Sequence, residues 1–223
     1  MHIGLIAGIG PAATDFYYRG LIERHAASGI PLELTMAHAD VREMSRNLTN
    51  NDPAAQADIF ARLVERLKGA GAVAAAITSM GGHFCVKQLE AISLLPILNA
   101  IPEIGAAVAR RKLKKIGVIG TRTVMQSRLY GGMPGVEIVA PEGAAMDEVH
   151  TAYIEMAGIG RVTDAQRRIF FEVGRHLCQE RGAEAIMLGG TDLFLAFVGQ
   201  ETPFPLVDCA DIHVDAIYRA SAG

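Results

Sequence analysis

The chain has 223 residues, of which half are apolar and one-fifth are charged, and its formal net charge is −3. It is long enough to bury a large core, and its charge gives no electrostatic footprint for nucleic acid or an anionic membrane. No apolar stretch approaches the roughly 18 residues that span a bilayer, and a strand begins at once without a leader pattern, so we expect a cytoplasmic protein without membrane contact. The three cysteines form no CxxC pair, which argues against a structural zinc site or a disulfide framework.

Short apolar runs of strand length alternate along the chain with stretches of helical periodicity. This alternation is typical of β-α-β units around a parallel sheet. The expected strands cover residues 2–7, 32–38, 73–78, 95–98, 116–119, 136–139, 184–188 and 205–208. Helices fill the intervals between them. Two have clear start signals: Asp52 followed by Pro53, and Thr163 with Gln166 in the capping-box position.

Three features of the chain recur at a nearly constant distance. The recurring pairs begin at Ile3 and Ile116, Gly71 and Gly182, and Pro96 and Pro205, which are 113, 111 and 109 residues apart. We therefore expect an α/β fold of two similar Rossmann-like lobes, each a mostly parallel sheet flanked by helices, related by a pseudo-two-fold internal duplication. The lobes would cover residues 1–110 and 111–223, with the last helix packing back on the first lobe. A cleft between such lobes is a natural ligand site.

The loop after the first expected strand, residues 8–13, fits the G-x-G-x-x-A form of a dinucleotide loop. Pro11 removes one amide donor that would hold a pyrophosphate. The other interpretation is a tight strand-to-helix turn whose glycines give backbone freedom. Thr14 would either cap the helix or face the cleft.

Hydroxyl residues and glycines follow three other expected strands. Thr78 and Ser79, Thr121 after Gly120, and Thr191 after Gly190 all stand at carboxyl ends, where ligands bind in parallel sheets. Such hydroxyls and free amides are suited to gripping a carboxylate, although each threonine also fits a helix cap.

Two pairs of side chains have the spacing of metal ligands. They are His38 with Asp40 and Cys209 with His213. Neither pair has an implied third ligand, so we expect no metal.

Taken together, these loops resemble the aspartate/glutamate/hydantoin racemase family over nearly the whole chain. Five segments carry the resemblance: residues 8–14 (GIGPAAT, like the family's GGMGPxAT), 120–122 (GTR), 148–150 with Gly160, 188–192 (LGGTD, like LGCTE), and 205–208 with His213. The resemblance implies a cofactor-independent enzyme, without pyridoxal phosphate, that acts on an amino acid or dicarboxylate. It also implies two cysteines on opposite sides of the cleft, one removing and one returning the α-proton.

At the two aligned cysteine positions this chain has Thr78 and Gly190. A threonine hydroxyl is a poor base unless a neighbour activates it, and glycine has no side chain to exchange a proton. The resemblance therefore indicates a family member with altered acid/base groups. For the catalytic role we nominate Thr78, Asp192, and Cys209 as a displaced thiol. The other interpretation of Cys209 is a small buried core residue.

The resemblance also indicates a substrate-binding set. Arg46 would either neutralise a distal carboxylate of the substrate or be an exposed surface arginine. The set comprises Gly10, Thr14, Arg46, Ser79, Thr121, Gly190 and Thr191. We expect no cofactor, a small-molecule amino acid or dicarboxylate as the partner, and a homodimer.

Three functions stay open on the sequence. The first is an amino-acid racemase or related isomerase with altered acid/base residues. The second is decarboxylation, elimination or hydrolysis of a small carboxylate in the same cleft, with Thr78, Ser79 and Thr191 stabilising the negative charge. The third is a carboxylate-binding protein that has lost catalysis.

Overall fold

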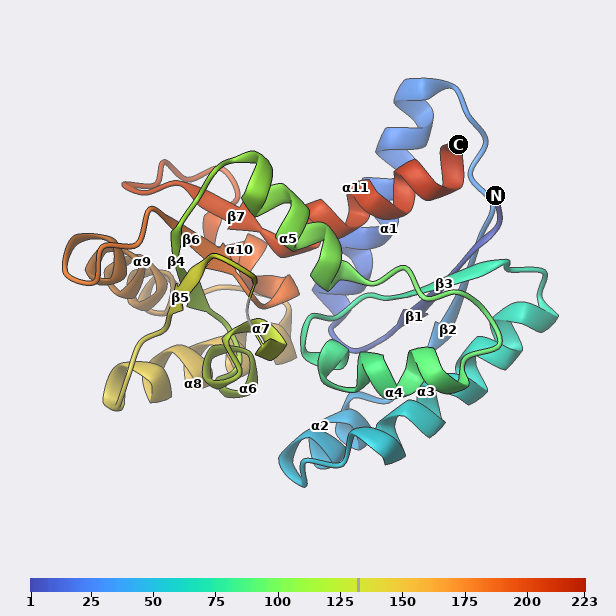
Figure 1. Cartoon of the computed structure of the whole chain (residues 1–223), viewed down its shortest axis with the longest axis horizontal. Coiled ribbons are helices and arrows are strands. Elements are labelled where there is room, and N and C mark those ends of the chain that lie inside the picture. The colour runs from blue at the N-terminus through green and yellow to red at the C-terminus, as the bar shows by residue number, and fades with distance from the viewer. Residues whose placement is uncertain (132) are drawn as a thin grey trace. The chain divides into compact units, whose positions relative to one another are not determined.

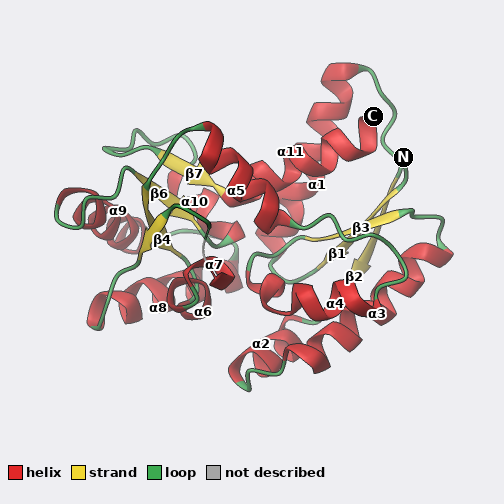
Figure 2. Cartoon of the chain, viewed as in Figure 1, coloured by secondary structure: helices red, strands yellow, loops and turns green. Residues whose placement is uncertain are grey.

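The computed structural model describes residues 1–131 and 133–223. The chain divides into two compact units, and each is an α/β unit in its own right (Figures 1 and 2). The first unit comprises Met1–Ala100 and Asp211–Gly223, and the second comprises Ile101–Ala210. Both boundaries fall inside helices, so each junction between the units is helical.

The first unit has a parallel sheet with the strand order β2-β1-β3. Its strands are β1 (Ile3–Ala7), β2 (Leu34–His38) and β3 (Ala74–Ile77). The central strand and β3 are buried along their whole length, as expected for a parallel sheet covered on both faces. Beyond β3, Ile97 joins the sheet through a single parallel bridge to Ala75.

Helices cover both faces of this sheet. They are α1 (Pro11–Ser28), α2 (Val41–Thr49), α3 (Pro53–Gly69), the 3₁₀ helix η1 (Gly81–Cys85), α4 (Val86–Ile92), the start of α5 (Ala100–Arg110), and most of α11 (Cys209–Ala222). Figure 1 shows α3 and α4 on one side of the sheet and α1 with α11 on the other. The two chain ends lie close together, and the Met1 amino group donates to the Ser221 carbonyl.

The second unit has a parallel sheet with the strand order β5-β4-β6-β7. Its strands are β4 (Lys115–Ile119), β5 (Glu137–Val139), β6 (Ala185–Leu188) and β7 (Leu206–Asp208). Its helices are the rest of α5, α6 (Arg122–Gln126), α7 (Arg128–Gly131), α8 (Ala144–Ile159), α9 (Asp164–Gln179), the 3₁₀ helix η2 (Thr191–Leu193), and α10 (Phe194–Phe197). Helix α9 packs on β4 and β6, and α8 packs on α9 and on η2.

The two sheets have the same plan, because β1 and β4 are both central and their neighbours correspond in order. A glycine in each central strand explains part of the sequence repeat. A Cβ on Gly4 would lie 2.8 Å from the Leu67 side chain of α3, and one on Gly117 would lie 3.1 Å from the Leu177 side chain of α9. A larger residue at either position would force the leucine side chain or its helix to shift. The expected α/β fold with two similar parallel-sheet lobes is confirmed.

Seven of the eight expected strands are present with shifts of one or two residues at their ends. The prediction of a strand at 95–98 was wrong, because only Ile97 makes a bridge there. The start signals of two helices are confirmed: Asp52 caps α3, and Thr163 with Gln166 forms a capping box at α9. Within the described residues, no helix has both the length and the apolar character needed to cross a membrane.

Candidate functional site

The carboxyl ends of the parallel strands gather most of the residues that the sequence nominates. The strand registers show which turns correspond between the units. Ile6 pairs with Ile77 in the first sheet, and Ile119 pairs with Leu188 in the second. The next amide donates back to the central strand in both, from Thr78 to Ile6 at 3.0 Å and from Gly189 to Ile119 at 2.8 Å. Thr78 therefore corresponds to Gly189, and Ser79 corresponds to Gly190.

The loop after β1 is closed by Thr14. Its hydroxyl accepts from the Gly8 amide and donates to the Gly10 carbonyl, both at 3.0 Å. Gly10 precedes α1 with a φ of 144°, a conformation that favours glycine, and Pro11 opens the helix. Both interactions of the Thr14 hydroxyl belong to a strand-to-helix turn, and the Gly8 amide is already bonded.

The turn after β3 has two buried hydroxyls with partners in the same unit. Thr78 Oγ1 donates to the Ile6 carbonyl at 3.0 Å. Ser79 Oγ accepts from the Gly82 amide at 3.2 Å. The Thr78 hydrogen is thus committed to the backbone, whereas the Ser79 hydroxyl has used only an acceptor position.

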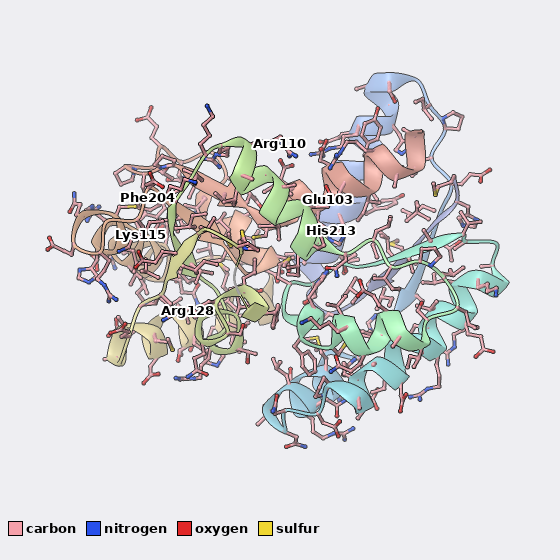
Figure 3. The ribbon with its side chains drawn as sticks, in the orientation of Figure 1. Glu103, Arg110, Lys115, Arg128, Phe204 and His213 are labelled. Atoms are coloured by element: carbon pink, nitrogen blue, oxygen red, sulfur yellow. The ribbon has the colours of Figure 1, made fainter. Side chains whose placement is uncertain are left out.

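Of two buried histidines near this turn, His83 is bonded to it and His213 packs edge-on against the His83 ring. His83 Nδ1 donates to the Ser79 carbonyl at 2.7 Å, and its Nε2 accepts from the Ala100 amide at 3.3 Å. His213, labelled on α11 in Figure 3, donates from Nε2 to the Leu98 carbonyl and accepts from the Tyr17 hydroxyl at Nδ1. Burial lowers the pKa of His83 to about 4 and that of His213 to about 3. Both rings are therefore neutral.

In the second unit, the turn after β4 is fixed to α8. The Thr121 hydroxyl accepts from the Val124 amide at 3.3 Å and so caps α6. The Arg122 amide donates to His150 Nδ1 at 3.2 Å, and its guanidinium pairs with Asp147 at 2.7 Å. Burial and the nearby Arg122 charge lower the pKa of His150. Thr121 therefore has a cap role, and α8 is anchored across the end of β4.

Position 190, after β6, is covered by an aromatic ring from α8. The Gly190 backbone is extended, with φ −124° and ψ 130°, which any residue adopts. However, a Cβ there would lie 2.3 Å from Cε2 and 2.9 Å from the hydroxyl oxygen of Tyr153. Glycine is required at 190 by the Tyr153 ring and not by backbone conformation.

The hydroxyl of Tyr153 donates to Asp192 Oδ2 at 3.2 Å. Burial, followed by the Asp192 charge, raises the pKa of Tyr153 well above its usual value. Thr191, which is 1% exposed, lies beside this pair. Its hydroxyl is close enough to lower the pKa of the phenol slightly, yet within the described chain Oγ1 has no partner of hydrogen-bond geometry. A buried hydroxyl without a partner costs about 1–3 kcal/mol, and a ligand atom would remove that cost.

Two of the nominated residues have settings that do not suit their expected roles. Arg46 is in the last turn of α2, with its side chain 66% exposed and 3.9 Å from Glu43. Cys209 is completely buried at the start of α11, and burial together with the Asp208 charge raises its thiol pKa well above the ordinary value. The thiolate that a displaced catalytic cysteine needs is therefore disfavoured.

The described residues contain no group of three metal-ligating side chains. Of the two pairs considered, Asp40 caps α2 and pairs with Arg42, and both nitrogens of His213 are hydrogen-bonded. A hollow of about 600 Å³ between α8 and α9 is lined by residues outside the nominated set, among them Glu155 and Ile169.

The sequence analysis missed the residues that surround the two turns. Tyr153 is the most important of them, because it covers Gly190 and contacts Asp192. One sequence signal was available for Tyr153: it follows His150 by three residues, between the positions 148–150 and Gly160 that carry part of the family resemblance. For His83, the signal was its place four residues after Ser79.

Comparisons with known proteins agree on one family. The sequence profile of the Asp/Glu/hydantoin racemases matches residues 6–217. A Yersinia pestis protein provisionally assigned as an Asp/Glu racemase superposes with a TM-score of 0.83 at 23% identity, covering all of both chains. An aspartate racemase homologue from Pyrococcus horikoshii OT3 gives 0.79 at 22% identity, covering 100% of this chain and 99% of that one.

Glutamate racemase from Francisella tularensis, solved in complex with D-glutamate, gives a TM-score of 0.66 at 15% identity over 98% of this chain and 80% of that one. At such identities the structural likeness shows the fold alone, whereas the sequence profile spans nearly the whole chain. The chain belongs to the Asp/Glu/hydantoin racemase family.

Proposed function

We propose that this protein binds a small carboxylate, an amino acid or a dicarboxylate, at the turn after β6 and transfers a proton at the adjacent carbon. The reaction uses neither pyridoxal phosphate nor a pair of thiols. The observation that carries the proposal is the buried Thr191 hydroxyl, which has no partner in the described chain. Family membership gives the class of ligand for which such a hydroxyl is suited.

Each turn, taken within its own unit, has a hydroxyl hydrogen suited to a ligand's carboxylate. In the first unit, Ser79 Oγ accepts from the Gly82 amide and keeps its own hydrogen. In the second unit, Thr191 Oγ1 has no partner in the described chain. Thr78, whose hydrogen is given to Ile6, would hold the first turn in shape and offer only its lone pairs. Thr78 would then act through its oxygen lone pairs and not as a proton donor.

Residue identity and burial support the proposal of altered acid/base groups. The motif comparison aligns the two family cysteines with Thr78 and Gly190, whereas the strand registers pair Gly190 with Ser79; none of these three residues carries a thiol. Cys209 is held as a protonated thiol by its burial. Proton transfer would then depend on hydroxyl groups, of which Tyr153 is the one paired with a carboxylate, that of Asp192.

A decarboxylase is the second candidate, and the balance of acids over bases favours it. Tyr153 holds its proton firmly, and the His83 pKa is about 4 with both ring nitrogens already bonded, so neither is a strong base at neutral pH. In a decarboxylation the carbon–carbon bond to the departing carboxylate breaks, and its electrons stay on the α-carbon. A proton donor then suffices to complete the reaction, and no base is needed.

The test is incubation of the purified protein with a panel of amino acids, dicarboxylates and substituted malonates in deuterated water. Deuterium at the α-carbon of both enantiomers supports the isomerase, and carbon dioxide release with deuterium incorporation supports the decarboxylase. Thermal stabilisation without either product indicates a binding protein that has lost catalysis. No stabilisation and no product across the panel would contradict the proposal.

A further inference from the structure

Tyr153 fills the space that a side chain at position 190 would need. A Cβ built on Gly190 would lie 2.6 Å from the ring carbon Cζ and 2.9 Å from the phenol oxygen of Tyr153. The sulfur of a cysteine at 190 would be one bond beyond that Cβ. The phenol oxygen, 2.9 Å from that Cβ, therefore lies beside the position that such a sulfur would take.

The phenol is held in this place by neighbours on two elements. The ring comes from α8, which is anchored across the end of β4 by the Arg122 contacts with His150 and Asp147. Its hydroxyl donates to Asp192 Oδ2 at 3.2 Å. A tyrosine has only two side-chain torsions, so one packed face and one hydrogen bond fix the oxygen well.

Thr191 adds an observation that points to a ligand at the same spot. Its hydroxyl is buried, lacks a hydrogen-bonding partner in the described chain, and is close to the Tyr153 hydroxyl. The Tyr153 hydroxyl, which donates to Asp192, and the Thr191 hydroxyl, which has no partner in the described chain, therefore both lie near Gly190. A carboxylate oxygen bound by Thr191 would bring the neighbouring carbon toward the phenol.

We propose that Tyr153 is the catalytic acid of this site, with its phenol hydroxyl beside the position of the missing thiol and Thr191 binding the ligand's carboxylate. This assignment rests on the proposed function. In the step, the phenol O–H bond breaks and a C–H bond forms at the α-carbon, whose electron pair comes from the carbon–carbon bond that broke when the departing carboxylate left as carbon dioxide. The resulting phenolate regains a proton from water before the next turnover.

The buried setting suits an acid better than a base. Because burial and the Asp192 charge raise the pKa of Tyr153, the phenol keeps its proton at neutral pH until a carbanion forms. The same setting makes the phenolate a costly resting state, so we assign Tyr153 the delivery of a proton and not its removal.

Tyr153→Phe is the decisive variant, since it keeps the ring over Gly190 and removes only the hydroxyl. We expect kcat for the substrate found in the panel to fall by at least about 100-fold, the typical lower bound for a general acid. The dissociation constant, measured by calorimetry, should change by less than about threefold. The matched control is Tyr18→Phe, the same change at a tyrosine of α1 that is 41% exposed, and it should leave both quantities unchanged.

The outcomes separate this assignment from the proposed function. Wild-type turnover that persists in Tyr153→Phe, or a loss confined to binding, would overturn the assignment alone. A wild-type protein without turnover on the panel would overturn both. If Tyr153→Phe does not fold, Gly190→Cys with Tyr153→Ala decides: its turnover should exceed that of Tyr153→Ala alone and be lost on thiol alkylation. Equal turnover in the two variants would contradict the assignment.

Discussion

The turn after β3 and the turn after β6 occupy the same place in their sheets, but they differ in whether their buried hydroxyls have hydrogen-bond partners. After β3, the hydroxyls of Thr78 and Ser79 both bind backbone groups of their own unit. After β6, the Thr191 hydroxyl is buried without a partner in the described chain. In the first turn both hydroxyls therefore have a partner in the fold, whereas the Thr191 hydroxyl of the second turn has none among the described residues.

The two turns also differ at the corresponding positions Ser79 and Gly190. Ser79 carries a side chain, but the corresponding residue Gly190 has none, and Tyr153 from α8 takes the space. Similar backbones therefore support different chemistry, because neighbours outside the repeat decide which atoms reach each strand end. The duplication of the fold therefore does not imply that the two turns have the same acid/base groups.

The largest expected effect is a loss of stability at low pH, caused by the buried histidines near the first turn. His83 and His213 have pKa values of about 4 and 3 in the folded protein, below the ordinary 6.5. As the pH falls below about 6.5, the unfolded chain binds protons that these rings cannot, so the free energy of unfolding falls. For His83 alone the loss is on the order of 3 kcal/mol by pH 4.

Urea denaturation at pH 7.5, 5.5 and 4.5 measures this loss. His83→Asn should flatten the pH dependence, since an amide does not titrate and still donates to the Ser79 carbonyl. His38→Asn, at an exposed histidine of the same unit, is the matched control and should leave the slope as it is. A wild-type protein whose stability is constant from pH 7.5 to 4.5 would show that the histidines are not buried as described.

A smaller effect should follow from giving position 190 a side chain. In Gly190→Ala the new methyl meets the Tyr153 ring at 2.3 Å, and such overpacking costs about 1–3 kcal/mol. Adding Tyr153→Ala should recover part of that loss, because the ring that causes it is gone. Ser79→Ala is the counterpart in the other turn and should cost only about 1 kcal/mol, the value of one hydrogen bond. Strictly additive losses in the double variant would contradict the close packing.

The smallest effects should have opposite signs in the two turns. Thr78→Val removes the bond from Oγ1 to the Ile6 carbonyl and should destabilise the protein by about 1 kcal/mol. Thr191→Val replaces a buried, unsatisfied hydroxyl with a methyl group and should stabilise it by about 1 kcal/mol. Denaturant midpoints for both variants at pH 7.5 measure the difference, and two losses of equal size would remove the distinction between the turns.

Much of the fold was predictable because its signals are local. The repeated Ile-Gly pair marks both central strands, and the caps at Asp52 and Thr163 mark two helices. The error at 95–98 arose because an apolar run with a proline can bridge a sheet at one residue without forming a strand. The family was also within reach of the sequence, since its motifs are contiguous.

The site was only partly predictable because its chemistry depends on contacts across the fold. Thr191 and Asp192 were found from their place after a strand. Tyr153 was not, because it reaches them from a helix 39 residues earlier in sequence than Asp192. The burial of Cys209, which keeps its thiol protonated, and the exposure of Arg46 also depend on tertiary packing. Neither can be predicted from local sequence patterns.

The central claim is that the turn after β6 holds the ligand through the unsatisfied Thr191 hydroxyl. Isothermal titration calorimetry tests it, using the carboxylate from the panel that gives the largest thermal shift. Thr191→Val should weaken binding by at least about tenfold, or 1.4 kcal/mol, although the variant is more stable than the wild type. The control Thr151→Val, an exposed threonine on α8, should bind as the wild type does. Equal affinity of Thr191→Val and the wild type would contradict the claim.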